Sequence, residues 1–207
     1  MNIPLVVIPD LPLAFDQKAR DIMGSLNCHQ LGIVQSFNPA KQTVVVQLCY
    51  KLVLNGKTQP APVLVDVPIF VLGGGDRVVK VPIHPGDSCL VLFNDRDMDN
   101  WFTTGTAAVP ASDRLHDLSD GLALVGFRSM ANPVPAYSVL DTEVRNGPSR
   151  ISVGEQLLLK NAATDLKMLL QMVVAALSQL NSVKSGGDAT AAITIVTEQI
   201  NLLLKSE

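Results

Sequence analysis

The sequence contains few charged and few aromatic side chains. Of its 207 residues, 17% are charged and 4% are aromatic, whereas 47% are hydrophobic. Because a soluble domain has about 25% charged residues, this chain has more apolar surface than one copy readily covers. No window reaches the roughly 20 uninterrupted apolar residues that a membrane-spanning helix needs. The excess therefore predicts contact with other protein, as in an obligate oligomer.

The chain also lacks a basic excess, a disulfide pattern and a signal peptide. Its net charge of −3 gives no electrostatic reason to expect nucleic acid as a ligand. The three cysteines, Cys28, Cys49 and Cys89, form no C-x-x-C pair, which predicts reduced, buried thiols. Residues 1–15 have no basic segment and are interrupted by prolines, so we expect no signal peptide.

The strongest pattern in the chain is a series of short apolar runs separated by turn residues. Asn55-Gly56 is the clearest hairpin signal, because both residues accept the positive φ of a tight turn. Pro62 and Pro68 cannot donate to a strand ladder, so their run predicts an edge or bulged strand. The expected strands cover residues 32–37, 42–54, 61–72, 78–83, 89–93 and 122–127, with turns at residues 38–41, 85–87 and 120–121, a loop at 73–76 and an acidic loop at 94–100.

Many short strands without interleaved helices predict an antiparallel barrel or sandwich. A five-stranded, partly open barrel fits the number of strands, and strand signals alone do not separate it from an immunoglobulin-like sandwich. Ahead of the strands, we expect an extended arm over residues 1–13 and a short amphipathic helix over residues 14–26. The expected segments are therefore an arm and helix (residues 1–26), a barrel (27–130) and a linker (131–140).

The C-terminal part changes period twice. Residues 141–161 alternate around an Asn146-Gly147 turn, which predicts short β-strands too small to close a core in one chain. Residues 162–207 show heptad spacing in two runs, interrupted at residues 185–188, which predicts a helical hairpin that packs against its copies. Asn161 or Thr164 is the expected N-cap. Residues 193–197 also favour strand, so helix and strand both stay open for the second run.

The sequence provides no complete catalytic, cofactor or metal pattern. Asp95, Asp97 and Asp99 resemble the start of a calcium loop, but Asn100 stands where Gly is needed and Thr106 where Glu is needed. A solvated loop at a barrel rim is the alternative that we favour, and such carboxylates would attract Arg or Lys from a partner. Glycines 73–75 lack the Lys of a phosphate loop, no serine sits in a G-x-S-x-G elbow, and no two histidines have ligand spacing. We expect neither an enzyme nor a cofactor.

The order of residues between positions 84 and 128 resembles the N-terminal OB-type domain of the central spike proteins of contractile-tailed phage baseplates. The resemblance covers roughly residues 20 to 130. It favours the OB-like barrel over the immunoglobulin-like sandwich. Trp101 and Phe102 are expected to be buried at the barrel wall or at a subunit interface. The residues that carry the resemblance are Gly86, Asp87, Phe93, Asp95, Arg96, Asp97, Asp99, Trp101, Gly105, Arg114, His116, Asp117, Leu118, Ser119, Asp120, Gly121, Gly126 and Phe127.

The resemblance implies a homotrimeric structural protein of the virion, made in a host cytoplasm, on the axis of a phage tail. Its expected partners are a trimeric baseplate hub, the host envelope during penetration, and a separate tip protein, unless the spike ends as a blunt plug. The family's His-x-His iron tip does not carry over, because no histidine follows His116. The motif residues Asp95, Arg96, Asp97, Asp99, Trp101, Arg114, His116, Asp117 and Asp120 are interface candidates. The trimer-axis candidates, in an intertwined β-prism and the helices after it, are Ile151, Val153, Leu157, Leu159, Leu166, Leu169, Val173 and Leu180.

A binding module remains the alternative to a structural protein. OB folds also bind single-stranded nucleic acid or carbohydrate, with bases stacked on aromatic side chains such as Trp101. That function needs a basic groove, and only Arg96 and Arg114 lie near the aromatic pair, among many acids.

Overall fold

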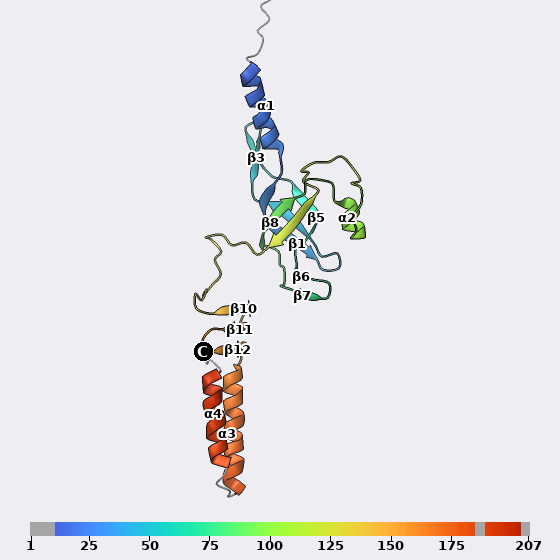
Figure 1. Ribbon diagram of the computed structural model, residues 1–207. Helices are drawn as coiled ribbons and strands as arrows, with labels where there is room; N and C mark the ends of the chain where they lie inside the picture. The colour runs from blue at the N-terminus through green and yellow to red at the C-terminus, as the bar shows by residue number, and fades with distance from the viewer. Residues whose placement is uncertain (1–10, 185–188, 204–207) are drawn as a thin grey trace, which may run out of the picture. The chain divides into compact units, whose positions relative to one another are not determined.

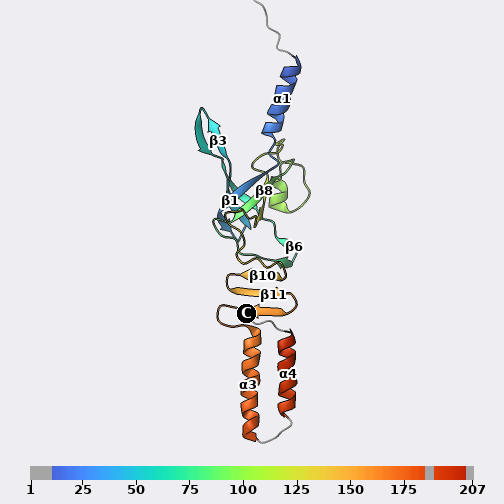
Figure 2. The same cartoon turned by 90° about the vertical axis from the view of Figure 1, so that its left-hand side faces the viewer.

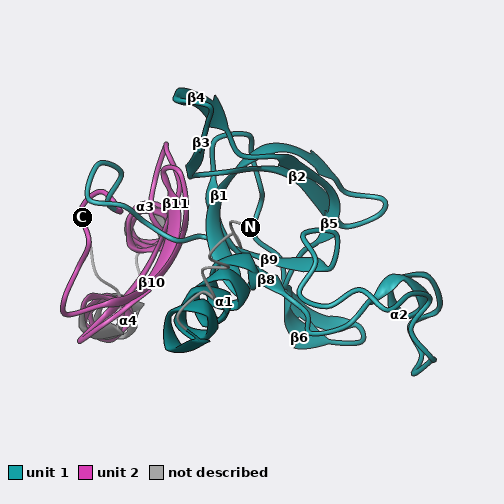
Figure 3. Cartoon of the chain, turned by 90° about the horizontal axis from the view of Figure 1, so that it is seen from above, with its two compact units in different colours: residues 1–133 teal, residues 134–207 magenta. Residues whose placement is uncertain are grey.

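The computed structural model describes residues 11–184 and 189–203 and divides the chain into two compact units. The first unit is Met1–Pro133 and the second is Val134–Glu207 (Figure 3). Each unit is described by itself below. Among the described residues, no helix combines the length and the hydropathy needed to cross a bilayer.

The first unit begins with helix α1, Leu11–Ser25 (Figure 1). The expected helix is confirmed, but it begins earlier than residue 14, so the extended arm does not reach residue 13. Pro12 is accommodated because the first turn of a helix needs no partner for its N–H groups. None of the α1 residues is buried, and Phe15 and Met23 are 66% and 75% exposed. Residues 1–10, the rest of the expected arm, lie outside the described residues.

Five antiparallel strands form the main sheet of this unit. Their order across the sheet is β5-β2-β1-β8-β9, so strand β1 lies in the centre. The strands are β1 His29–Asn38, β2 Thr43–Leu48, β5 Val63–Pro68, β8 Ser88–Phe93 and β9 Gly121–Val125.

The sheet curls until its two outer strands approach each other. A parallel bridge joins Ile69, just after β5, to Ala123 in β9, and the N–H of Phe70 donates to the Ala123 carbonyl at 2.8 Å. The result is a curled half-barrel that fits the five-stranded, partly open OB-type barrel. The prediction of an edge strand with a bulge is confirmed for β5, which ends at Pro68 and shifts register opposite Val44 and Val46.

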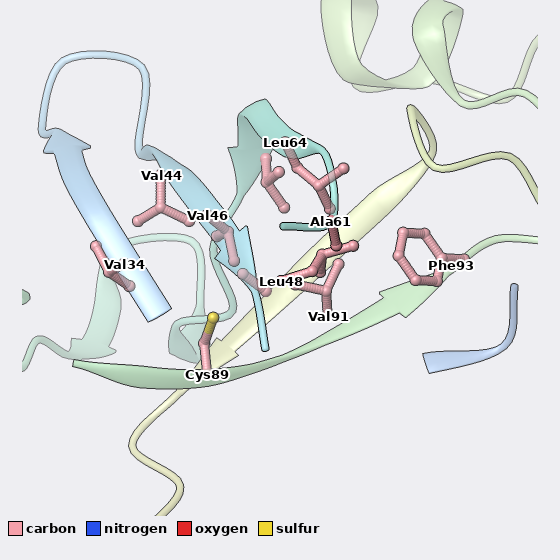
Figure 4. Close-up of a cluster of buried hydrophobic side chains, with 11 residues drawn as sticks. Val34, Val44, Val46, Leu48, Ala61, Leu64, Cys89, Val91 and Phe93 are labelled. Carbon is pink, nitrogen blue, oxygen red and sulfur yellow. The ribbon is translucent and has the colours of Figure 1, made fainter. Parts of the chain in front are cut away.

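The core lies inside this curled sheet and follows the strand alternation. Val44, Val46 and Leu48 of β2 are buried on one face, because alternate residues of a strand point the same way, and Val91 of β8 belongs to the same cluster (Figure 4). Burying a Val or Leu side chain stabilises a fold by about 1.5–3 kcal/mol. Gly32 is required in β1, because a Cβ there would lie 2.2 Å from Cγ1 of Val46.

Two small hairpins extend from the barrel and correct the strand predictions. Strand β3, Lys51–Leu54, pairs with β4, Lys57–Pro60, across the predicted Asn55-Gly56 turn (Figure 2). The chain breaks pairing after Leu48, so the expected single strand 42–54 is wrong. The expected loop at residues 73–76 is also wrong.

The second hairpin pairs β6, Leu72–Gly74, with β7, Arg77–Val79. Its formation depends on glycine, because Gly73 and Gly75 have φ of +134° and +63°, which other residues rarely adopt. The strand expected over residues 78–83 ends at Val79, since residues 80–87 form no strand.

The second unit contains a three-stranded antiparallel sheet followed by two helices. The strands are β10 Thr142–Asn146, β11 Ser149–Val153 and β12 Leu157–Lys160, and the helices are α3 Leu166–Lys184 and α4 Ala189–Leu203. The two helices pack side by side (Figures 1 and 2). The short β-strands and the first helix are confirmed, and the second run, left open between helix and strand, is a helix.

Asp165 caps α3, where Asn161 or Thr164 was expected. Its Oδ1 accepts the N–H of Met168 at 2.7 Å, whereas Asn161 Oδ1 accepts the N–H groups of Ala163 and Thr164 and so orders the preceding turn. An aspartate at this position also complements the helix dipole. The expected interruption at residues 185–188 lies outside the described residues.

Candidate functional site

The long connection between β8 and β9 carries most of the motif residues. It contains helix α2, Asp99–Thr104, which ends at Gly105 in the left-handed conformation, with φ of +68°. The expected acidic loop is therefore wrong at its end, because Asp99 and Asn100 form the first turn of α2. The carboxylate of Asp97 accepts the N–H of Asp99 at 2.8 Å and so fixes the entry to this helix.

Arg114 gathers three aspartates of this connection into one cluster. Its Nη2 lies 3.3 Å from Asp97, 3.0 Å from Asp99 and 2.9 Å from Asp120, and its Nε donates to Asp120 at 3.2 Å. The pair with Asp120 is bidentate, the geometry that gives a guanidinium its strongest hold on a carboxylate. We call Asp97, Asp99, Ser112, Arg114 and Asp120 the Arg114 cluster.

The Arg114 cluster is partly enclosed rather than solvated. The side chains of Asp97 and Asp120 have no exposed surface, and that of Arg114 is 30% exposed. The expectation of a solvated loop at the rim is therefore wrong for Asp97. Buried carboxylates need a partner charge, and this chain supplies its own arginine where we expected a partner's Arg or Lys.

Asp120 also joins the two ends of the connection. Its Oδ1 accepts the N–H of Met98 at 3.0 Å, and its backbone carbonyl accepts the N–H of Asn94 at 2.9 Å. Since Asn94 follows β8 and Asp120 precedes β9, these bonds anchor the connection at the edge of the sheet.

Hydrogen bonds control the ionisation of this cluster. The Ser112 hydroxyl, the N–H of Asp99 and the charge of Arg114 lower the pKa of Asp97. The bonds to Asp120 and Asp99 raise the pKa of Arg114 further above its ordinary range. Both groups are charged at neutral pH. The carboxylate oxygens of Asp97, Asp99 and Asp120 lie within 4.8 Å of one another, and the Arg114 guanidinium bridges all three.

The remaining polar motif residues shape the turn before β9. His116 has φ of +49°, and its carbonyl accepts a hydrogen bond from Nδ2 of Asn27 at 2.8 Å. The carboxylate of Asp117 accepts the N–H of Ser119 at 2.8 Å, which lowers the pKa of Asp117. Asp95 is 85% exposed and lies 3.8 Å from His116. Arg96 is exposed.

The aromatic pair of the motif lies on α2 and faces solvent in one copy of the chain. Trp101 is 50% exposed and Phe102 is 38% exposed. Burial at the barrel wall is therefore wrong, because α2 packs no buried residue against the sheet. The alternative, burial at a subunit interface, stays a prediction.

The β-strand candidates for the trimer axis share one face of the sheet in the second unit. Val144, Ile151 and Leu159 are aligned across the three strands by the ladder register, with Val153 beside Leu157. Ile151 and Val153 are 49% and 53% exposed. The opposite face instead buries Ser152 and Leu158.

The helical candidates lie along α3 at two levels of burial. Leu169 and Val173 are 47% and 55% exposed, and Leu166 is half-buried. The side chain of Leu180 lies outside the described residues. The trimer-axis candidates thus differ in how much apolar surface one copy of the chain leaves exposed. The exposed surface is greatest on β11 and on the middle of α3.

Sequence reasoning missed two residues that matter. Ser112 is not among the motif residues, and no local pattern marks it as a donor to Asp97. Leu158 lies between two other leucines, so alternation alone does not say which of the three faces inward.

Comparison with known proteins identifies the first unit. Residues 31–126 match the family model for the phage protein Gp138 N-terminal domain, so the match runs from the third residue of β1 to the end of β9 and contains the whole Arg114 cluster. A search of curated proteins found no match. The family match confirms the resemblance to a phage baseplate or spike-type protein with this N-terminal domain.

Proposed function

We propose, starting from this similarity to a phage structural protein, that the chain is a homotrimeric central spike or hub-spike component on the axis of a contractile tail. It would act in the virion during penetration of the host envelope. The observation that carries the proposal is the apolar surface of the second unit, which one copy leaves uncovered.

The sheet of the second unit supports a trimer through the difference between its faces. One face carries the exposed aliphatic side chains of Val144, Ile151 and Val153. The other face holds Glu143 between Arg145 and Arg150, with Arg145 also donating to the carbonyl of Pro135 at 2.7 Å. An apolar sheet face left open to water marks a surface that contacts other protein. Three copies that place this face toward a common axis would bury it.

The first unit offers surfaces for the neighbouring hub. Exposed apolar side chains occur on α1, on the β3–β4 hairpin and on the segment around β6–β7. Monomeric proteins rarely expose so many large apolar groups together, and such patches mark interaction sites. The members most exposed are Leu11, Leu13, Phe15, Met23, Val53, Phe70, Leu72 and Val81.

The proposed role is mechanical rather than catalytic. A rigid threefold assembly transmits axial force from a contracting sheath to an envelope, and it needs stiffness rather than a reactive group. The Arg114 cluster suits this role, because charge-assisted bonds hold the β8–β9 connection in one conformation. We propose a baseplate hub and a separate tip protein as the partners of this chain. Surface residues that contact neither partner are expected to face the envelope.

The oligomeric state of the full chain tests the proposal. We expect light scattering to give a trimer that persists at micromolar concentration. The double variant Ile151→Glu/Val153→Glu should dissociate it, because charge at the axis loses its solvation. Ala162→Glu, at an exposed position of the turn after β12, adds the same charge away from this face; it is the matched control and should stay trimeric. A wild-type monomer with a single cooperative melt would refute the spike assignment.

A further inference from the structure

Helix α3 retains a wide apolar surface after packing against α4. Met168, Leu169, Met172, Val173 and Leu177 are between 47% and 62% exposed, and Ala176 is exposed as well. Four of the half-buried positions, Leu166, Leu170, Val174 and Ser178, are spaced one turn apart, which places them on one side of α3, toward α4. The exposed set therefore lies on the sides of α3 that α4 does not cover.

The width of this surface indicates more than one further neighbour. Met168 and Met172 lie on one line along the helix, and Leu169 and Val173 lie about 100° around from it. A two-stranded coiled coil needs only a narrow stripe of two positions per heptad. Helix α3 has a second stripe in addition, as the inner helix of a larger bundle does.

Charge and spacing identify these neighbours as copies of α3 itself. Between Lys167 and Lys184 the helix has no charged residue, so this stretch offers no ion pair to a charged partner. Leu169, Val173 and Ala176 follow the four-three spacing of a heptad repeat, which is complementary to an identical parallel helix in the same register. The described exposed positions of α4 include Thr194 and Glu198 together with Ile195 and Val196, which are 58% and 48% exposed, so α4 carries a charged residue where this stretch of α3 has none.

We propose that three α3 helices form the inner layer of a six-helix bundle about the tail axis, with the three α4 helices outside. This inference rests on the proposed trimer and adds which helix lines the axis. The hydrogen bond from Gln171 Nε2 to Asn201 Oδ1, at 3.1 Å, would set the register of each outer helix on its inner helix.

Cysteine cross-linking of the full chain tests which helix is inside. The background is Cys28→Ser/Cys49→Ser, which removes the two exposed thiols. Cys89 stays, because burial raises its pKa to about 11 and keeps it in the unreactive thiol form. Ala176→Cys and Val173→Cys place thiols at the proposed axis with little change in volume, and Glu198→Cys is the outer control.

Equivalent residues of parallel helices meet near a threefold axis, within the roughly 7 Å between Cα atoms that a disulfide permits. On mild oxidation, we expect Ala176→Cys and Val173→Cys to form covalent dimers at least about tenfold faster than Glu198→Cys, because the effective concentration at the axis is high. Circular dichroism and light scattering confirm that each variant is helical and trimeric before oxidation.

A second measurement covers the case in which cysteine disturbs the helix. Val173→Lys should dissociate the trimer and Glu198→Lys should not. A trimer that cross-links faster through Glu198→Cys, or that tolerates Val173→Lys, would place α4 inside and overturn this inference while leaving the proposed function intact. A monomeric parent chain would remove both.

Discussion

At the scale of single residues, Arg114 and Asp120 determine how the β8–β9 connection is held. Asp120 is fully buried and receives two hydrogen bonds from Arg114 and one from the N–H of Met98. Removing one member of a buried pair leaves the other charge without compensation, which costs more than the pair itself contributes. The connection should therefore respond strongly to this one carboxylate.

Asp120→Ala is expected to lower the free energy of unfolding of the first unit by about 3 kcal/mol. Trp101 is the single tryptophan and lies on α2, so its fluorescence reports the connection during urea denaturation. Asp113→Ala, at an exposed position of the same connection, is the control and should change stability by less than about 0.5 kcal/mol. Equal effects of the two variants would contradict the role given to Asp120.

The pKa of Asp97 gives a dependence on pH with a defined sign. Its value in the folded chain is below the ordinary 3.8, so Asp97 stabilises the fold above pH 3.8, and this stabilisation is lost as the pH falls through the lowered value. Urea midpoints should be insensitive to pH between 5 and 7 on this account and should fall below about pH 4. Ser112→Ala removes the main cause of the shift and should move the loss to higher pH. An unchanged acid profile in Ser112→Ala would exclude the hydroxyl as that cause.

The sequence predicted which residues belong to this site but not how they pair. The motif named Asp97, Asp99, Arg114 and Asp120, because the family resemblance ordered them along the chain. Their contact depends on a turn that brings Arg114 back toward Asp97, which no local period encodes. Ser112 could not be predicted for the same reason, since its partner lies on the other side of α2 in the chain.

At the scale of helices and strands, the sequence predicted those elements whose position is set by nearby turn residues. The Asn55-Gly56 hairpin and the edge position of β5 were predictable, because positive φ and the missing proline N–H act within a few residues. The β6–β7 hairpin was missed because three consecutive glycines carry no side chains to show strand periodicity. Helix α2 was missed because it is shorter than two turns and because its first residue continues a run of aspartates that is typical of a loop.

The difference between the faces of the second sheet gives a prediction at this scale. Leu158→Ala should destabilise the second unit by about 2–5 kcal/mol, because Leu158 is 2% exposed and its loss leaves a cavity. Val144→Ala, 69% exposed in one copy, is the comparison. At protein concentrations low enough for the trimer to dissociate, Val144→Ala should leave the thermal unfolding temperature nearly unchanged. At concentrations at which the chain is trimeric, the same substitution should weaken the trimer. A concentration-independent effect of Val144→Ala would argue against an axial position.

At the scale of the whole molecule, the two units use different sources of stability. The first has its own core of buried residues inside the curled sheet. In the second, the described core residues are Ser152 and Leu158, while the helices leave their apolar sides open. Composition predicted this excess of apolar surface, but it could not say how the two units share it.

This contrast predicts how the two units behave when the chain is divided after Pro133. We expect residues 1–133 to form a folded, monomeric barrel with the Trp101 signal of the full chain. The complementary piece, residues 134–207, should be helical only at concentrations at which it is trimeric. Circular dichroism across a dilution series measures both. Helicity of the second piece that does not change on dilution would contradict the dependence on copies.

The pairing pattern of the two units also sets the order in which they become structured during synthesis. In the barrel, the central strand β1 pairs His29 with Leu92, so it remains without this neighbour until the ribosome has passed β8. In the second unit, every ladder joins strands adjacent in the chain, and such local contacts form fast. The strands of the second unit, although made after those of the barrel, are thus among the quickest to organise, and the slow step of maturation is closure of the barrel, where β5 must find β9.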